Sequence, residues 1–221
     1  MAELIEELDA GRVAANLECL RARIEDARVG SPHGAREPIE ILAAAKYVPD
    51  AALPVLARAG VTLLGENRAQ DLERKVAACG DVFTWDFIGQ LQSRRVRSIV
   101  PHVRMIHSLA SASAREQLAR HGRAELAVLV QVNLAGEEGK AGVAPAELDS
   151  FIAGCDFPIA GLMAMPPLAS DPEASRPWFA ALRELAAERG LERLSMGTSQ
   201  DHVVAAQEGA TIVRIGTSLY D

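Results

Sequence analysis

The chain has 221 residues, of which 49% are hydrophobic and 24% are charged, and its formal net charge is −7. This composition is typical of a globular protein with a sizeable core, and we expect one domain over residues 1–221. The acidic balance argues against nucleic acid as a partner, and no run of about 18 apolar residues predicts a membrane helix. Three scattered cysteines and an acidic start without a signal-peptide pattern favour a cytoplasmic setting.

The first predicted element is an amphipathic helix over residues 3–28, within an N-terminal segment 1–30. Its apolar stripe has spacings of four, three and four residues and consists of Val13, Leu17, Leu20 and Ile24. From residue 41 onward, short apolar runs alternate with segments of helical composition. Eight of these runs are predicted strands: 41–46, 61–64, 83–88, 103–107, 126–133, 159–163, 192–196 and 211–215.

This alternation predicts a parallel sheet with helices outside, and eight repeats close a (β/α)8 TIM barrel over residues 41–221. The fold class is therefore α/β, with the N-terminal helix as an addition. An open doubly wound sheet shares the same local signals and remains the alternative. Segment 166–177, rich in Pro and Ser, is expected to be a surface loop, with a lid as the less favoured interpretation.

Reactive side chains of a parallel barrel project from the carboxyl ends of its strands. The polar or methionine residues that follow the predicted strands are Lys46, Glu66, Asn67, Gln90, His107, Asn133, Met163, Met165, Ser199 and Arg214. Taken singly, each has a purely structural alternative. An asparagine can cap a turn, a histidine can satisfy a core hydrogen bond, and a methionine can fill a gap.

Two glycine-containing segments, MGTSQD (196–201) and RIGTS (214–218), follow the last two strands. Gly197 and Gly216 allow a backbone to approach a ligand closely, and Ser199 and Thr217 supply hydroxyl groups. Ser199 also stands where the next helix is expected to begin. Because this corner of a barrel commonly binds phosphate, the two segments predict a site for a phosphorylated ligand.

Lys46 ends the first apolar run, ILAAAK, and we expect it at the inner end of a buried strand. Moving an ammonium group into an apolar interior costs several kcal/mol, so burial favours the neutral amine, which attacks carbonyl carbons. The alternative is a lysine that reaches the rim or pairs with a carboxylate such as Glu66.

Seven segments together resemble one known family. In chain order they are AAAKYVPD, LLGENRAQDLERKV, WDFIGQLQSRRV, IHSLAS, LVQVNLAGEEGKAGV, GLMAMPP and LSMGTSQDHVVAAQEGATIVRIGTSLYD. Their order and spacing from residue 41 to the C-terminus are similar to those of the pyridoxal-phosphate homeostasis proteins. The resemblance implies a single barrel like the alanine racemase N-terminal domain, which is the type III fold of pyridoxal 5′-phosphate (PLP) proteins without the second β domain.

The same resemblance implies an internal aldimine between PLP and Lys46, and Arg214 as the donor to the pyridine nitrogen. The remaining implied cofactor neighbours are Asn67 and Met196, and around the phosphate Ser199, Gly216 and Thr217. Since a guanidinium group only donates, the pyridine nitrogen facing it stays unprotonated, which weakens the ring as an electron sink. Four residues depart from the family pattern without removing the anchor or the phosphate site: Ala45, Arg68, Gln90 and Thr198.

The expected function is therefore PLP homeostasis, in which the chain buffers or carries the cofactor without catalysis. Because the sequence ends at Asp221, we expect no second domain of the kind that supplies a catalytic tyrosine in racemases. Tyr47 is expected to face away from Lys46, and Tyr220 to lie near the rim. Expected partners are PLP and PLP-requiring apoenzymes, and the family implies a monomer. The alternatives are a PLP-dependent racemase or lyase, and a cofactor-free Schiff-base aldolase.

Overall fold

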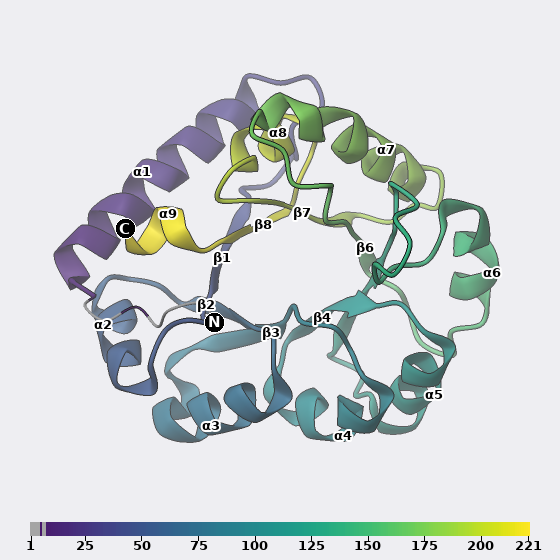
Figure 1. Ribbon diagram of the computed structural model, residues 1–221, viewed down its shortest axis with the longest axis horizontal. Coiled ribbons are helices and arrows are strands. Elements are labelled where there is room, and N and C mark those ends of the chain that lie inside the picture. Colours follow the sequence, from purple (N-terminus) through teal and green to yellow (C-terminus); the bar gives the residue numbers. More distant parts are fainter. Residues whose placement is uncertain (1–4, 6–7) are drawn as a thin grey trace.

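The computed structural model describes residues 5 and 8–221 of the chain, and its centre is a closed barrel of eight parallel strands (Figure 1). Each strand pairs with its neighbours in sequence, and β8 closes the barrel by pairing with β1. The strands are β1 (Glu40–Ala44), β2 (Leu63–Glu66), β3 (Thr84–Phe87), β4 (Met105–Leu109), β5 (Ala127–Gln131), β6 (Gly161–Met163), β7 (Arg193–Thr198) and β8 (Ile212–Ile215). The predicted TIM barrel is confirmed, and the open-sheet alternative is wrong.

Helices surround the barrel on its outside (Figure 1). They are α1 (Ala10–Val29), α2 (Leu53–Arg58), α3 (Ala69–Cys79), α4 (Val96–Ile99), α5 (Ala112–His121), α6 (Leu148–Ala153), α7 (Arg176–Ala187), α8 (His202–Gln207) and α9 (Thr217–Tyr220). Short 3-10 turns cover Asp50–Ala52, Gly80–Val82, Ser93–Arg95, Val100–His102, Pro145–Glu147 and Pro172–Ser175. Within the described chain, no helix combines the length and apolar character needed to traverse a bilayer.

Helix α1 begins later than the sequence predicted. Asp9 has an extended backbone, and its side chain accepts a hydrogen bond of 2.7 Å from the N–H of Arg12, which caps the helix at Ala10. The start predicted at residue 3 is therefore too early, although residues 1–4 and 6–7 lie outside the described part. The predicted apolar stripe is buried and packs against α8 and α9.

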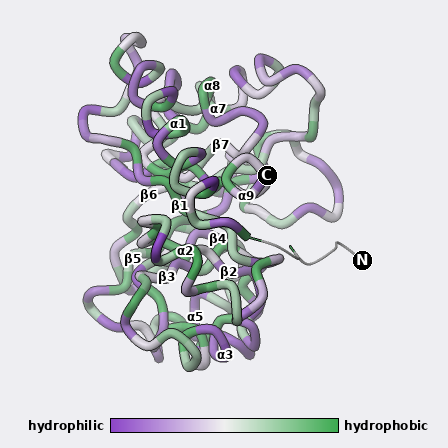
Figure 2. The backbone as a smooth tube through the Cα atoms, turned by 90° about the vertical axis from the view of Figure 1, so that its left-hand side faces the viewer, coloured by the Kyte–Doolittle hydropathy of each residue, from purple (hydrophilic) through white to green (hydrophobic). Residues whose placement is uncertain are grey.

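The strands separate two apolar cores. Outward-facing side chains pack against the helices, whereas the barrel interior is filled by Leu42, Leu63, Met105, Leu129, Met163 and Ile212. Hydrophilic segments lie mainly in the outer helices and loops when the molecule is seen from the side (Figure 2). Because side chains alternate along a strand, the residue two positions after an inward Ile212 also faces inward, and that residue is Arg214.

Strand β1 ends before Lys46, contrary to the predicted run 41–46. The N–H of Ala45 still bonds to Gly65 of β2, but the carbonyl of Ala45 accepts from the N–H of Val48 at 3.0 Å and closes a turn. Lys46 and Tyr47 therefore lie in this turn rather than in the strand. This difference in backbone changes the environment of both side chains.

Candidate functional site

A cavity of about 630 Å³ lies at the carboxyl ends of the strands, and we call it the mouth cavity. Its wall is formed by Ile5 and by residues from the ends of β1, β2, β3, β6, β7 and β8 or from the segments after them. Six of the seven cofactor neighbours expected from the sequence line it: Lys46, Asn67, Ser199, Arg214, Gly216 and Thr217. Its volume is in the range of small-molecule sites, which are about 300–1,000 Å³.

The seventh residue, Met196, is not among the residues that line the cavity. Its side chain is fully buried and belongs to the core between the barrel and the helices. The neighbouring Ser195 contacts side chains inside the barrel, so Met196 faces the opposite side of β7.

Lys46 is exposed, so the expectation that it lies buried at the inner end of β1 is wrong. The turn after β1 carries the side chain to the rim, where Nζ lies 4.6 Å from the centre of the Tyr47 ring. Tyr47 lines the same cavity, so the expectation that it faces away from Lys46 is also wrong. What the structure shows is an accessible amine at the mouth, beside an aromatic face that favours a cation.

The buried lysine of this region is Lys75 on α3, which the sequence analysis missed. Its Nζ donates 2.5 Å hydrogen bonds to Glu66 Oε1 and to the carbonyl of Ala45, and the side chains of Lys75 and Glu66 are at most 2% exposed. Glu66 Oε2 in turn accepts from the N–H of Asn67 at 2.7 Å. Lys75, not Lys46, is thus the partner of Glu66, and it fixes the backbone next to Lys46 and Asn67.

A signal for Lys75 exists in the sequence. Ala69, Leu72 and Lys75 follow one another at spacings of three on α3, and all three are buried. A lysine that continues the apolar face of a helix is a candidate for a buried, paired charge.

The segments after β7 and β8, for which the sequence predicts a phosphate site, form one corner of the cavity, which we call the phosphate corner. Here one hydroxyl group accepts hydrogen bonds from two backbone N–H groups. Ser199 Oγ accepts from the N–H groups of Gly216 and Ser218 at 3.0 and 3.3 Å. Asp201 braces the loop because its Oδ1 accepts from the N–H of Thr198 at 2.7 Å. The following helix α8 begins at His202, so the prediction that it begins at Ser199 is wrong by three residues.

The two glycines of this corner have different roles. A Cβ added to Gly216 would meet no atom within 4 Å, whereas one added to Gly197 would lie 2.5 Å from Ala205 Cβ. Gly197 also has a φ of +90°, in the region that favours glycine. Gly197 is therefore required for packing against α8, and only Gly216 leaves open space in the cavity wall.

Arg214 is 6% exposed and receives no carboxylate partner within the described residues. Its Nη1 donates to Ser195 Oγ at 2.5 Å, and its Nη2 to the carbonyl of Ala164 at 3.0 Å and to Met165 Sδ at 2.9 Å. Burial lowers the pKa of Arg214 to about 10, which still leaves the guanidinium protonated at neutral pH. Arg214 thus places a positive charge without a paired carboxylate, among the described residues, in the wall of the mouth cavity.

Asn67 adds an acceptor without a partner to the wall of the cavity. Its Oδ1 is buried and makes no hydrogen bond within the described chain. A buried amide oxygen in this state costs free energy unless a donor reaches it, so it offers an acceptor to a ligand in the cavity.

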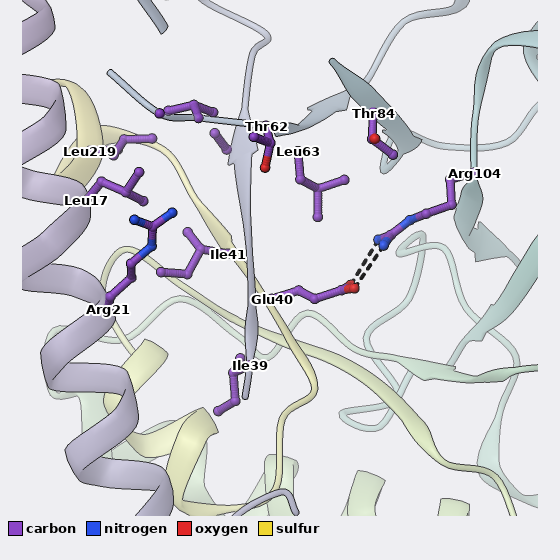
Figure 3. Close-up of a pocket in the computed structure, with 13 residues that line it drawn as sticks. Leu17, Arg21, Ile39, Glu40, Ile41, Thr62, Leu63, Thr84, Arg104 and Leu219 are labelled. Atoms are coloured by element: carbon purple, nitrogen blue, oxygen red, sulfur yellow. Dashed lines mark hydrogen bonds and ion pairs between the residues drawn. The ribbon is translucent and has the colours of Figure 1, made fainter. Parts of the chain in front are cut away.

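A second cavity, of about 360 Å³, lies near the amino ends of the first strands (Figure 3). Arg104 points into it but is held by two 2.9 Å hydrogen bonds to Glu40, and it also bonds to the buried Asp86. Its charge is compensated by carboxylates, and the amino end of a TIM barrel usually serves stability. The mouth cavity is therefore the candidate functional site.

Comparisons with known proteins show the structural class of this chain. Residues 8–221 match the family model of the alanine racemase N-terminal domain. The alanine racemase of Corynebacterium glutamicum shares the fold with a TM-score of 0.70 and 18% identity, over 100% of this chain and 63% of that one.

Relatives with higher identity define the family. The pyridoxal phosphate homeostasis protein of Aquifex aeolicus is 38% identical over 195 residues, which cover 82% of this chain and 86% of that protein. The one of Pseudomonas aeruginosa is 36% identical and covers 94% of both chains. PipY of Synechococcus elongatus, solved with PLP bound, is 33% identical with a TM-score of 0.78, over 95% of this chain and 100% of that one. The chain belongs to the pyridoxal phosphate homeostasis protein family.

Proposed function

We propose that this protein binds PLP in the mouth cavity through a Schiff base with Lys46 and acts as a buffer or carrier in PLP homeostasis. The names of its relatives and the PLP-bound structure of PipY support this proposal. The observation that carries it is the meeting of Lys46, Arg214 and the Ser199–Gly216 corner in one cavity. The proposed carrier acts in the cytoplasm as a monomer and supplies PLP-requiring apoenzymes.

The residues of the cavity fit the chemical groups of PLP. The amine of Lys46 suits the aldehyde carbon, and the pyridine nitrogen suits a guanidinium donor such as Arg214. The N–H groups of Gly216 and Ser218 and the hydroxyl of Ser199 meet at one corner of the cavity, and these donors would hold the phosphate of PLP. Bound PLP would supply an electrophilic carbon and a conjugated ring.

Two features support a carrier rather than an enzyme. Arg214 cannot protonate the pyridine nitrogen permanently, since a guanidinium retains its proton at neutral pH. Tyr220 donates its hydroxyl to the carbonyl of Ala44 at 3.1 Å, and burial raises its pKa, so this hydroxyl stays protonated and is a poor base. Tyr47, in the wall of the same cavity, is the feature that favours the racemase alternative.

Absorption spectroscopy with added PLP tests binding. After unbound PLP, which is itself coloured, is removed by gel filtration, the wild type and the exposed-lysine control Lys140→Ala should retain the visible Schiff-base band, and Lys46→Ala should not. A wild-type protein that stays colourless, or a Lys46→Ala variant with an unchanged band, contradicts the proposal.

Turnover assays separate a carrier from an enzyme. The PLP-loaded protein is incubated with a panel of L-amino acids, and racemisation or consumption is followed, with Tyr47→Phe as the comparison. We expect no multiple turnovers, together with reactivation of an added PLP-dependent apoenzyme. Multiple turnovers that disappear in Tyr47→Phe establish the racemase alternative instead.

A further inference from the structure

A row of buried polar side chains runs from the mouth cavity into the barrel. Arg214 of β8 bonds to Ser195 of β7, Ser195 Oγ lies 2.8 Å from His107 Nδ1 on β4, and His107 Nε2 lies 3.2 Å from Asp86 Oδ2 on β3. Asp86, His107 and Ser195 are each 0% exposed. We call these three the axial polar row.

Asp86 at one end of the row and Arg214 at the mouth determine where the hydrogens on His107 and Ser195 lie. Burial raises the pKa of Asp86, but hydrogen bonds from His107 and Arg104 outweigh it and lower the pKa, so the carboxylate is charged and only accepts. His107 Nε2 must therefore carry a proton and donate to Asp86. Burial also lowers the pKa of His107, so its other nitrogen, Nδ1, is a bare acceptor at neutral pH.

The serine hydroxyl completes the sequence of donors. Arg214 can only donate, so Ser195 Oγ accepts from it, and the hydroxyl hydrogen is directed to His107 Nδ1. A lone pair of Ser195 is thereby held toward the guanidinium group. Arg214 gains a fixed orientation without a carboxylate that would neutralise its charge.

We propose that Asp86, His107 and Ser195 are positioning residues that fix the tautomer of His107, the direction of the Ser195 hydroxyl and, through it, the donor direction of Arg214 in the mouth cavity. The predicted tautomer of His107 does not depend on PLP binding, because it exists without ligand. Only the effect of Arg214 orientation on PLP affinity rests on the proposed function. If Nδ1 carried the proton instead, His107 and Arg214 would both donate to Ser195 Oγ, and the serine hydrogen would lose its acceptor.

Nitrogen-15 NMR of histidine-labelled protein without ligand tests the tautomer directly. We expect the neutral Nε2–H form of His107 at neutral pH, with its resonances assigned by their loss in His107→Gln. In Asp86→Asn the amide nitrogen can donate to Nε2, and the Nδ1–H form should gain population. A wild-type His107 that is charged, or that carries its proton on Nδ1, overturns the inference whatever happens with PLP.

PLP affinity tests the consequence at the site. We expect Ser195→Ala and His107→Leu to weaken binding about tenfold, since hydrogen bonds to charged groups contribute strongly. His107→Gln should stay within about threefold of the wild type, because a Gln amide can accept from Ser195 and donate to Asp86. Circular dichroism confirms that each variant is folded, and Lys140→Ala is the matched surface control.

A double-mutant cycle distinguishes positioning from general damage. If Ser195 acts through Arg214, Ser195→Ala should have no further effect on PLP affinity in the Arg214→Met background. Independent, additive losses overturn the inference, as does a wild-type affinity and spectrum in both Ser195→Ala and His107→Leu. A wild type that fails to bind PLP at all contradicts the proposed function instead, and the NMR result still decides the tautomer.

Discussion

The two ends of the barrel differ in how they pair an arginine: Arg104 is partly exposed and Arg214 is buried. Toward the amino ends, Arg104 bonds to Glu40 and Asp86, and although burial lowers its pKa, these hydrogen bonds outweigh burial and raise it. At the mouth, Arg214 has only neutral hydrogen-bond partners among the described residues, and burial lowers its pKa to about 10. Arg104, whose charge is paired with carboxylates, contributes to stability, whereas Arg214, which has no such pair, can interact with an anionic ligand.

The largest effect should come from breaking the compensated end. Arg104→Met leaves the fully buried Asp86 without its guanidinium partner, and we expect the free energy of unfolding to fall by about 3–5 kcal/mol. Urea denaturation followed by circular dichroism measures it. The exposed Arg97→Met on α4 is the control, with a change of about 0.5 kcal/mol or less. Equal stability of Arg104→Met and the wild type would remove the proposed difference between the two ends.

Replacement of the arginine at the mouth by methionine should leave stability nearly unchanged and weaken PLP binding. Arg214→Met replaces a cation that has no carboxylate partner, so we expect the free energy of unfolding to change by less than about 1 kcal/mol. PLP affinity should fall tenfold to about a hundredfold, as for the loss of a charged hydrogen bond of about 1.5–3 kcal/mol. A strongly destabilised variant with wild-type affinity contradicts this assignment.

The two glycines of the phosphate corner sharpen the comparison on a smaller scale. Gly216→Ala adds a methyl group where no protein atom lies within 4 Å, so stability should hold while PLP affinity falls about tenfold. Gly197→Ala should instead cost about 1–3 kcal/mol of stability, because of its positive φ and the contact with Ala205. Calorimetric titration measures the affinity, and thermal unfolding measures the stability. A loss of stability in Gly216→Ala, together with a loss of affinity alone in Gly197→Ala, would contradict these roles.

The smallest effect concerns pH. Burial lowers the pKa of His107 and of His202, so below the usual histidine pKa of about 6.5 the unfolded chain binds protons that the folded chain does not. Stability should therefore fall as the pH decreases from about 6.5, by at most about 1.4 kcal/mol per pH unit and histidine. His107→Gln should reduce this slope, and the exposed His121→Gln should not. An unchanged slope in His107→Gln shows that this histidine is not held neutral.

Much of the architecture could be predicted because it depends on local patterns. Alternating apolar runs and helical segments determine the barrel, and the rule that side chains project from strand ends places Lys46, Arg214 and Ser199 in one cavity. The burial of Lys46 was predicted wrongly because the turn closed by Val48 and Ala45 ends β1 early. Apolar sequence alone does not distinguish the last strand residue from the first turn residue.

The missed residues depend on contacts between distant segments. Lys75 bonds to Ala45, 30 positions earlier, and His107 bonds to Ser195, 88 positions later. The pairing of β1 with β2 brings Lys75 of α3 to Ala45, and the closed barrel brings His107 of β4 to Ser195 of β7 across its interior. The resemblance to the family predicted Lys46 as the anchor and Ser199, Gly216 and Thr217 as the phosphate site, but it did not indicate which side chains hold them in place.

The position of the covalent bond tests the central claim most directly. The sequence contains three lysines, which are the exposed Lys46, the buried Lys75 and the exposed Lys140. The protein is loaded with PLP, reduced with borohydride and digested, and the peptides are analysed by mass spectrometry. We predict a pyridoxyl group on Lys46, with Lys75 and Lys140 unmodified at one equivalent of PLP. Modification of Lys140 at a similar level, or an unmodified Lys46, would contradict the account.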